Sequence, residues 1–216
     1  MCISYPFFEP NKGVFVNTDK CLFNLHILVL GNSHHCGECS IKDCSSHLNS
    51  DCKQRTKDLI KDHIKGKDNK KNALYKFEDI MNKGNKNNFR EIFWKSISFY
   101  NYLQIALPKS NMSPAPYYDD YSEKSFWDVL EHLHPDCMIV WGKSFYNYLP
   151  GNFKDGRWVH LDSFTANGES ISVNAIKLKN KHMVKVLPIH HPAYYGRYKK
   201  NPAYWREQIY KFLYNC

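Results

Sequence analysis

Two short apolar segments, one near each end of the chain, stop abruptly at small or polar residues. The first reads NLHILVLGNSHH over residues 24–35, and the second reads VKVLPIHHPAYYGRYKKNPAYW over residues 184–205. Their β-branched runs are typical of buried strands, and in each segment a loop follows the carboxyl end of the predicted strand. Ligands bind at this edge of an open α/β sheet. The two segments therefore predict a shared site at one edge of a sheet.

The rest of the chain alternates between strand and helix patterns. We expect strands at residues 24–31, 137–141 and 183–189, a strand-like end to the segment 89–104, and helices over 53–64, 73–81, 122–133 and 203–214. Strands that alternate with helices favour a parallel sheet. We therefore predict an α/β fold: a central, mostly parallel, four-stranded sheet with helices on both faces.

The chain length suits one domain. With 216 residues and a hydrophobic fraction of 43%, we expect a single domain over residues 1–216, with a cysteine-rich insertion at 36–52. A domain of this size buries roughly 70% of its unfolded surface. No apolar run is long enough to span a bilayer, and the first residues lack a basic stretch followed by an apolar one. We expect a cytoplasmic monomer.

The chain is basic, with 30 Lys and Arg against 21 Asp and Glu and a formal net charge of +9. Nucleic-acid-binding proteins carry such a charge because each neutralised phosphate releases condensed counterions. A lysine-rich solvated face gives the same total, so charge alone does not separate the two. Histidine pairs at 34–35 and 190–191 in the two loops favour chemistry on a polyanion, and DNA is the first candidate.

Four motifs occur in a fixed order: GNSHHCG (31–37), FYNYLQIALPKSNMSPAP (99–116), HPDCMIVWGKS (134–144) and HPAYYGRYKKNP (191–202). Through these four motifs taken together, the chain resembles the uracil-DNA glycosylase superfamily over most of its length, from residue 24 to 213. It is most similar to the branch that carries an iron-sulfur cluster, whose motifs read GEAPG, TN before a Pro-rich stretch, RPxxIVxLG and HPAxLLRNP. The resemblance implies hydrolysis of the N-glycosidic bond of uracil or a modified pyrimidine in DNA after base flipping.

The resemblance also implies roles for individual residues. His191 donates a hydrogen bond to the base carbonyl on which negative charge grows, and Asn101 reads the pyrimidine edge. Asn32 and Ser33 lie where the attacking water is placed. The residues implied to contact the flipped nucleotide or its phosphate are Gly31, His34, His35, Asn101, Pro192, Ala193, Tyr194 and Arg197. Tyr194 or Tyr195 could also wedge into the duplex or stack on a base.

The chain departs from the family pattern at two positions. Asn32 stands where the GEAPG motif has an acidic residue, and an amide can orient a water molecule but cannot deprotonate it. A catalytically silent nucleic-acid-binding or host-defence protein, which recognises unusual DNA through the same pocket, therefore remains an alternative. Ile105 stands where the branch has a cluster cysteine, so we expect no iron-sulfur cluster of the family type.

Four cysteines follow the first loop in the order C-x2-C-x4-C-x7-C, namely Cys36, Cys39, Cys44 and Cys52. Four thiolates in one short loop suit a tetrahedral, structural Zn²⁺. His34, His35 or His47 could replace one cysteine, and unbound thiols in a polar loop are the alternative. Cys137 lies in an apolar run and is predicted to belong to the core.

Overall fold

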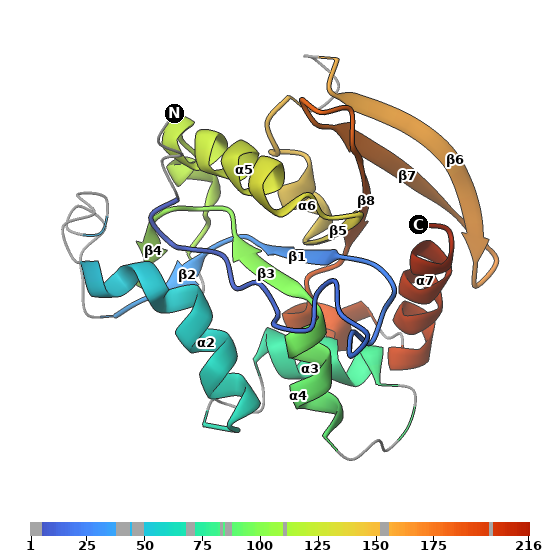
Figure 1. The fold of residues 1–216 in the computed structure, drawn as a ribbon, viewed down its shortest axis with the longest axis horizontal. Coiled ribbons are helices and arrows are strands. Elements are labelled where there is room, and N and C mark those ends of the chain that lie inside the picture. Colours follow the sequence, from blue (N-terminus) through green and yellow to red (C-terminus); the bar gives the residue numbers. More distant parts are fainter. Residues whose placement is uncertain are drawn as a thin grey trace.

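A six-stranded sheet forms the centre of the fold, with the strand order β3-β1-β5-β8-β7-β6 (Figure 1). The computed structural model describes residues 6–37, 44, 50–67, 72–82, 84, 88–109, 112–151, 156–198 and 201–216. The strands are β1 (Ile27–Gly31), β3 (Ser98–Asn101), β5 (Cys137–Trp141), β6 (Trp158–Ala166), β7 (Glu169–Lys177) and β8 (Met183–Ile189).

Four neighbouring strands, β3, β1, β5 and β8, are parallel. In their register, Gly31 lies opposite Asn101 and Trp141 lies opposite Ile189. Strands β1 and β5 are buried along their whole length, as expected for a parallel sheet covered on both faces. The prediction of a mostly parallel α/β sheet is confirmed, and the parallel register brings the ends of these strands to one edge.

The prediction of four strands is wrong, because β6 and β7 extend the sheet as an antiparallel hairpin beside β8. Strand β6 lies at the edge of the sheet, and most of its residues are exposed or half-buried. Its sequence therefore lacks the apolar run that marks a buried strand. The turn between the two strands is Asn167–Gly168, both with positive φ (51° and 75°). This dipeptide is a strong hairpin signal.

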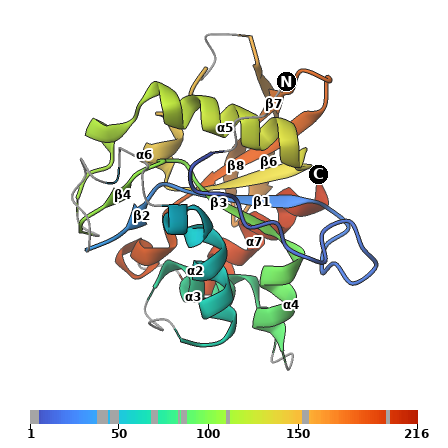
Figure 2. The same ribbon diagram turned by 60° about the vertical axis from the view of Figure 1, so that its left-hand side comes forward.

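Helices cover both faces of the sheet, as predicted (Figures 1 and 2). They are α2 (Arg55–Ile64), α3 (Ala73–Met81), α4 (Phe89–Ser96), α5 (Asp120–Leu133), α6 (Lys143–Tyr146) and α7 (Pro202–Tyr214), with 3₁₀ turns η1 (Ser50–Gln54), η2 (Ala115–Tyr117) and η3 (Pro192–Tyr198). The side chains of Asn72, Asp119 and Asn201 accept backbone N–H groups and cap α3, α5 and α7. None of the described helices has the length and apolar character needed to cross a bilayer.

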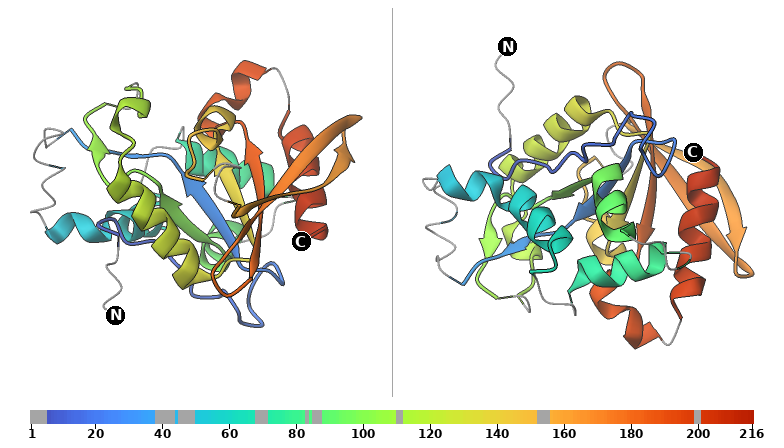
Figure 3. Two further views of the ribbon diagram at one scale, coloured as in Figure 1. Left: turned by 90° about the horizontal axis from the view of Figure 1, so that it is seen from above. Right: turned by 60° about the horizontal axis from the view of Figure 1, so that its bottom comes forward.

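Each face of the sheet has its own core. One core joins the sheet to α2, α3, α4 and α7 and contains Phe77, Trp94 and Ile209. The other lies beneath α5 and α6 and contains Tyr100 and Phe126. Helix α7 also packs along the β6–β7 hairpin, where the side-chain amide of Asn167 donates to the carbonyl oxygen of Tyr204 at 2.8 Å (Figure 3).

A second, two-stranded sheet extends from the ends of β1 and β3. Its strands β2 (His34–His35) and β4 (Ala106–Leu107) are parallel, with His34 opposite Ala106. Figure 2 shows this pair beside the start of α2. The small sheet fixes the loop after β1 against the segment after β3, which is the region where the sequence predicts a site.

Candidate functional site

The ends of β1 and β3 approach each other so closely that the position of Gly31 requires glycine. A Cβ atom added to Gly31 would lie 2.1 Å from Oδ1 of Asn101, well inside van der Waals contact. The absent side chain therefore leaves the space that the Asn101 amide occupies. The two predicted residues lie together because their strands are adjacent and in register.

Asn101 is 4% exposed, and its amide faces the ring of His34. The Nδ2 atom of Asn101 lies 3.3 Å from each ring nitrogen of His34. His34 Nε2 lies 2.9 Å from the hydroxyl of Thr56 on α2, and the ring packs edge-on against Phe8. Burial lowers the pKa of His34 to about 3, so its imidazole is neutral at physiological pH. His34 thus covers the Asn101 amide, for which the resemblance implies a role in base reading.

Asn32 is held by the hydroxyl of Tyr118, a residue in the loop before α5. Its Nδ2 donates to that hydroxyl at 2.9 Å, and its Oδ1 lies 3.2 Å from the same atom. Burial raises the pKa of Tyr118 to about 12, so the phenol keeps its proton. The Tyr118 ring packs against those of Tyr102 and Tyr148. Ser33, the next residue after Asn32, is half-buried.

His191 follows β8 at the same edge of the sheet as Asn101. Its Nδ1 accepts the backbone N–H of Ala193 at 3.2 Å, which assigns the ring proton to Nε2. Burial is the main cause that lowers the pKa of His191 to about 4, with His35 and Lys76 adding to the shift. At physiological pH the ring is therefore neutral and has an N–H donor at Nε2. Because β1 and β8 belong to the same run of parallel strands, the loops after them leave the same edge of the sheet.

The loop after His191 is fixed from two directions. Lys76 on α3 donates to the carbonyl oxygen of Ala193 at 2.7 Å, and Pro192 is buried. Tyr195 is buried and stacks on Trp205, with ring centroids 4.8 Å apart. Both contacts hold η3 against the helices on one face of the sheet.

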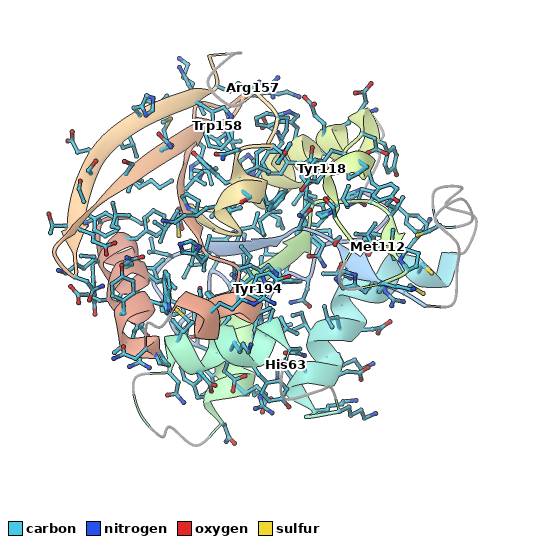
Figure 4. The ribbon with its side chains drawn as sticks, turned by 180° about the vertical axis from the view of Figure 1, so that it is seen from behind. His63, Met112, Tyr118, Arg157, Trp158 and Tyr194 are labelled. Carbon is cyan, nitrogen blue, oxygen red and sulfur yellow. The ribbon has the colours of Figure 1, made fainter. Side chains whose placement is uncertain are left out.

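Tyr194 is the exposed residue of the tyrosine pair. Its exposed fraction is 42%, and the guanidinium of Arg197 lies 4.7 Å from the centre of its ring. Since the Tyr195 side chain is buried in the core, only Tyr194 of the two is accessible to wedge into a duplex or stack on a base. Figure 4 labels Tyr194 and Tyr118, which lie on η3 and near α5, on either side of the central strands.

Three of the predicted zinc ligands lie in one part of the structure. Cys36, Cys44 and Cys52 pack in a small cluster with Phe7, Phe8 and Ala106. The backbone N–H of Ala106 donates to Cys44 Sγ at 3.0 Å, while burial raises the pKa of the Cys44 thiol. Cys39 and His47 lie outside the described residues. Within the described ranges, no group of three or more His, Cys, Asp or Glu side chains is arranged to hold a metal ion.

The sequence predicts no role for four residues that support the site: Thr56, Lys76, Gln104 and Tyr118. Gln104 accepts the backbone N–H of Phe8 at 2.9 Å and donates to the hydroxyl of Tyr100 at 2.7 Å. Each of these four residues forms a hydrogen bond with a partner that is distant in the sequence. Gln104 also makes hydrogen bonds within its own loop. No local pattern signals such contacts.

No family model, no curated protein and no solved structure matches this chain. The likeness of its four motifs to the uracil-DNA glycosylase superfamily stays a hypothesis drawn from those residues. Any functional proposal therefore depends on the chemistry of the side chains gathered at the strand ends.

Proposed function

We propose that this chain is a DNA glycosylase that hydrolyses the N-glycosidic bond of uracil or a modified pyrimidine. The observation that carries the proposal is His191, a neutral imidazole with an N–H donor at Nε2, placed at the end of β8. A fixed donor of this kind stabilises charge that develops on a base carbonyl in a water-poor site. The loop with His35 and the end of β3 with Asn101 lie at the same edge as His191, because β3, β1, β5 and β8 are parallel.

In the proposed reaction, the bond between C1′ of the sugar and the base nitrogen breaks, and its electron pair leaves with the base. His191 Nε2–H donates a hydrogen bond to the carbonyl oxygen on which this negative charge accumulates. Water adds its oxygen to C1′ and releases a proton, and the pyrimidine anion takes up a proton. The Asn32 amide, itself held by Tyr118, accepts a hydrogen bond from the attacking water and orients it.

Base recognition by Asn101 requires a rearrangement of the loop after β1. The Asn101 amide is buried against His34, so a pyrimidine edge can reach it only when the His34 ring moves away. Because His34 is neutral, this movement breaks no ion pair, but the ring gives up its contacts with Thr56 and Phe8. Base flipping would supply the ligand that replaces the ring.

The second candidate is a catalytically silent nucleic-acid-binding or host-defence protein that recognises unusual DNA through the same pocket. Two observations favour it. Asn32 stands where the family has an acidic residue, and the Asn101 amide is covered by His34. Such a protein would bind modified DNA without producing abasic sites. In either case we propose that the protein is a cytoplasmic monomer with DNA as its partner, and the formal net charge of +9 supports the choice of DNA.

A panel of oligonucleotides separates the two candidates. Single- and double-stranded DNA containing uracil, hydroxymethyluracil, other modified pyrimidines or hypoxanthine is incubated with the purified chain and then treated with alkali. The glycosylase proposal predicts strand cleavage at the modified pyrimidine in at least one substrate. Tight binding to one of these bases without cleavage favours the silent protein.

A structural zinc ion in the cysteine-rich insertion is a separate proposal. Its support is the spacing of the four cysteines and the clustering of Cys36, Cys44 and Cys52 beside the N–H donor of Ala106. Zinc would order the insertion without activating water. Elemental analysis of protein purified without chelators tests this. The expected result is about one zinc per chain, whereas no metal together with freely titrating thiols removes the proposal.

A further inference from the structure

A groove that the strand-end site does not use runs beside α2. It has a volume of ≈ 520 Å³ and lies between residues 11–14, α2 and the end of α4. The side chains that give it charge are Lys12, Lys57, Lys61, Lys65 and Lys95. A second hollow of ≈ 490 Å³ shares Lys12, Lys57 and Lys61 and continues the groove towards α5.

The walls of the groove are fixed by backbone contacts. The N–H of Gly13 donates to the carbonyl oxygen of Ile97 at 3.1 Å, and that of Phe15 donates to Lys95 at 2.8 Å. A Cβ atom on Gly13 would lie 2.3 Å from the carbonyl oxygen of Lys95, so the two segments are in close contact. Buried Ile60 and Trp94 form part of the lining. The groove is therefore a packed feature of the fold.

Three of the lysines form a stripe that follows one face of α2 and ends at Lys65, the residue that caps the C-terminal end of the helix. Lys57, Lys61 and Lys65 are spaced by four residues, which places successive side chains about 6 Å apart along the helix axis. Lys12 and Lys95 come from the two segments that border the stripe. The five cations therefore form a track rather than a single point.

The charge of the groove is only partly neutralised. Glu9 pairs with Lys57 and lines the second hollow, and Glu91 pairs with Lys95 and lines the groove. In the described part of the chain, Lys12, Lys61 and Lys65 form no ion pair with a carboxylate. Asp58 and Asp62 belong to α2 but do not line either hollow. An anion in the groove would face the three unpaired lysines.

We propose that this groove binds the sugar-phosphate backbone of a nucleic acid and guides the strand that enters the strand-end site. Helix α2 links the two places: Arg55, at its start, donates to the carbonyl oxygen of His35, and Thr56 contacts His34. Figure 1 shows α2 beginning beside β2 and running towards α4. A row of lysines suits successive phosphates because each ammonium acts as a point charge on a flexible stem.

The choice of a nucleic acid over another polyanion rests on the proposed function. The existence of the groove and its positive charge do not depend on that function.

The test uses the full chain with Lys61→Glu and Lys65→Glu combined, and a second variant in which both lysines become Gln. The matched control is Lys179→Glu, an exposed lysine in the turn between β7 and β8. Binding of a fluorescent oligonucleotide without a modified base is measured at several salt concentrations, and unfolding in urea confirms that each variant folds.

The proposal predicts at least a ten-fold weaker affinity at low salt for both groove variants. It also predicts that the slope of log K against log salt falls by about two, one for each lost phosphate contact. The Lys179→Glu control should keep the affinity and slope of the unchanged chain. Equal affinity and slope in all four proteins, or an equal loss in the control, overturns the proposal. Groove variants that lose affinity for an acidic peptide and keep it for DNA overturn it as well.

The outcome for the groove can be separated from that for the glycosylase. If the unchanged chain excises no base but the groove variants lose affinity and slope, the groove proposal stands and the enzymatic one fails. If excision occurs and the slope does not change, the groove proposal alone fails.

Discussion

At the scale of single residues, the polar atoms of the candidate site depend on partners that are not themselves predicted site residues. Asn32 is held by Tyr118, His34 by Thr56, and the His191 loop by Lys76. Each partner can be changed without removing the group it positions. This allows the contribution of positioning to be measured separately from that of the reacting groups.

Replacement of Tyr118 by Phe should lower kcat for base excision by about five-fold, with little change in KM. The ring keeps its packing, but Asn32 loses the hydroxyl that fixes its amide, and one hydrogen bond is worth about 1 kcal/mol. The matched control is Tyr148→Phe, because Tyr148 is 56% exposed and packs beside Tyr118. Steady-state kinetics on one oligonucleotide substrate measure both. An unchanged kcat in Tyr118→Phe would exclude this role for Tyr118.

Replacement of Gly31 by Ala should destabilise the protein by about 1–3 kcal/mol and lower excision strongly, as overpacking does. The new Cβ would collide with the Asn101 amide, which would have to leave its position. Gly37→Ala is the control, since a Cβ there meets no atom within 4 Å. Urea unfolding and excision assays report the two effects. Equal stabilities for the two variants would show that the close approach of Gly31 and Asn101 does not constrain the fold.

At the scale of elements, the sequence predicts the parallel strands but not the β6–β7 hairpin, and the difference has a physical reason. Strands β1 and β5 are apolar throughout because both faces are covered, so composition alone identifies them. Strand β6 is an exposed edge strand, and its only strong signal is the Asn167–Gly168 turn. Gly31 and Asn101, both predicted site residues, lie together because they occupy paired positions at the ends of two adjacent parallel strands. The contacts of Thr56 and Tyr118 depend on how distant segments pack, which no local pattern encodes.

Helix α2 is joined to the strand-end loop by a buried contact, which gives a prediction at this scale. Thr56→Val removes the hydroxyl beside His34 Nε2 and leaves a buried ring nitrogen without that partner. The expected loss is about 1–3 kcal/mol in the free energy of unfolding. Thr165→Val, on an exposed position of β6, should change it by less than about 0.5 kcal/mol. Urea unfolding measures both variants. A Thr56→Val variant as stable as the unchanged chain would show that the contact between Thr56 and His34 does not stabilise the fold.

At the scale of the whole molecule, the buried His26 and His34 and the half-buried His191 make stability depend on pH. Burial lowers the pKa of His26 and His191 to about 4 and that of His34 to about 3, from the ordinary value of 6.5. In the unfolded chain each takes up a proton below pH 6.5, whereas in the folded chain each stays neutral until about pH 4 or lower. Since the unfolded state then binds more protons, acid favours unfolding.

The free energy of unfolding should therefore fall as pH decreases from 6.5 towards 4. Each histidine contributes up to about 1.4 kcal/mol per pH unit, so the three together give a slope of roughly 4 kcal/mol per unit near pH 5. Urea unfolding at pH 7.5, 6.5 and 5.5 measures this. A free energy of unfolding that stays constant or rises over this range would contradict the neutral state of these three rings in the folded chain.

The most direct measurement is base excision by His191→Ala, compared with the unchanged chain and with His160→Ala, an exposed histidine on β6. Abasic sites are counted after alkali treatment of the best substrate in the panel, and DNA affinity is measured in parallel. The account predicts that the unchanged chain and His160→Ala excise the base, whereas His191→Ala is at least ten-fold slower and binds DNA as tightly, because the lost hydrogen bond forms mainly in the transition state. Near-normal excision by His191→Ala, or no abasic sites with any substrate, would contradict it.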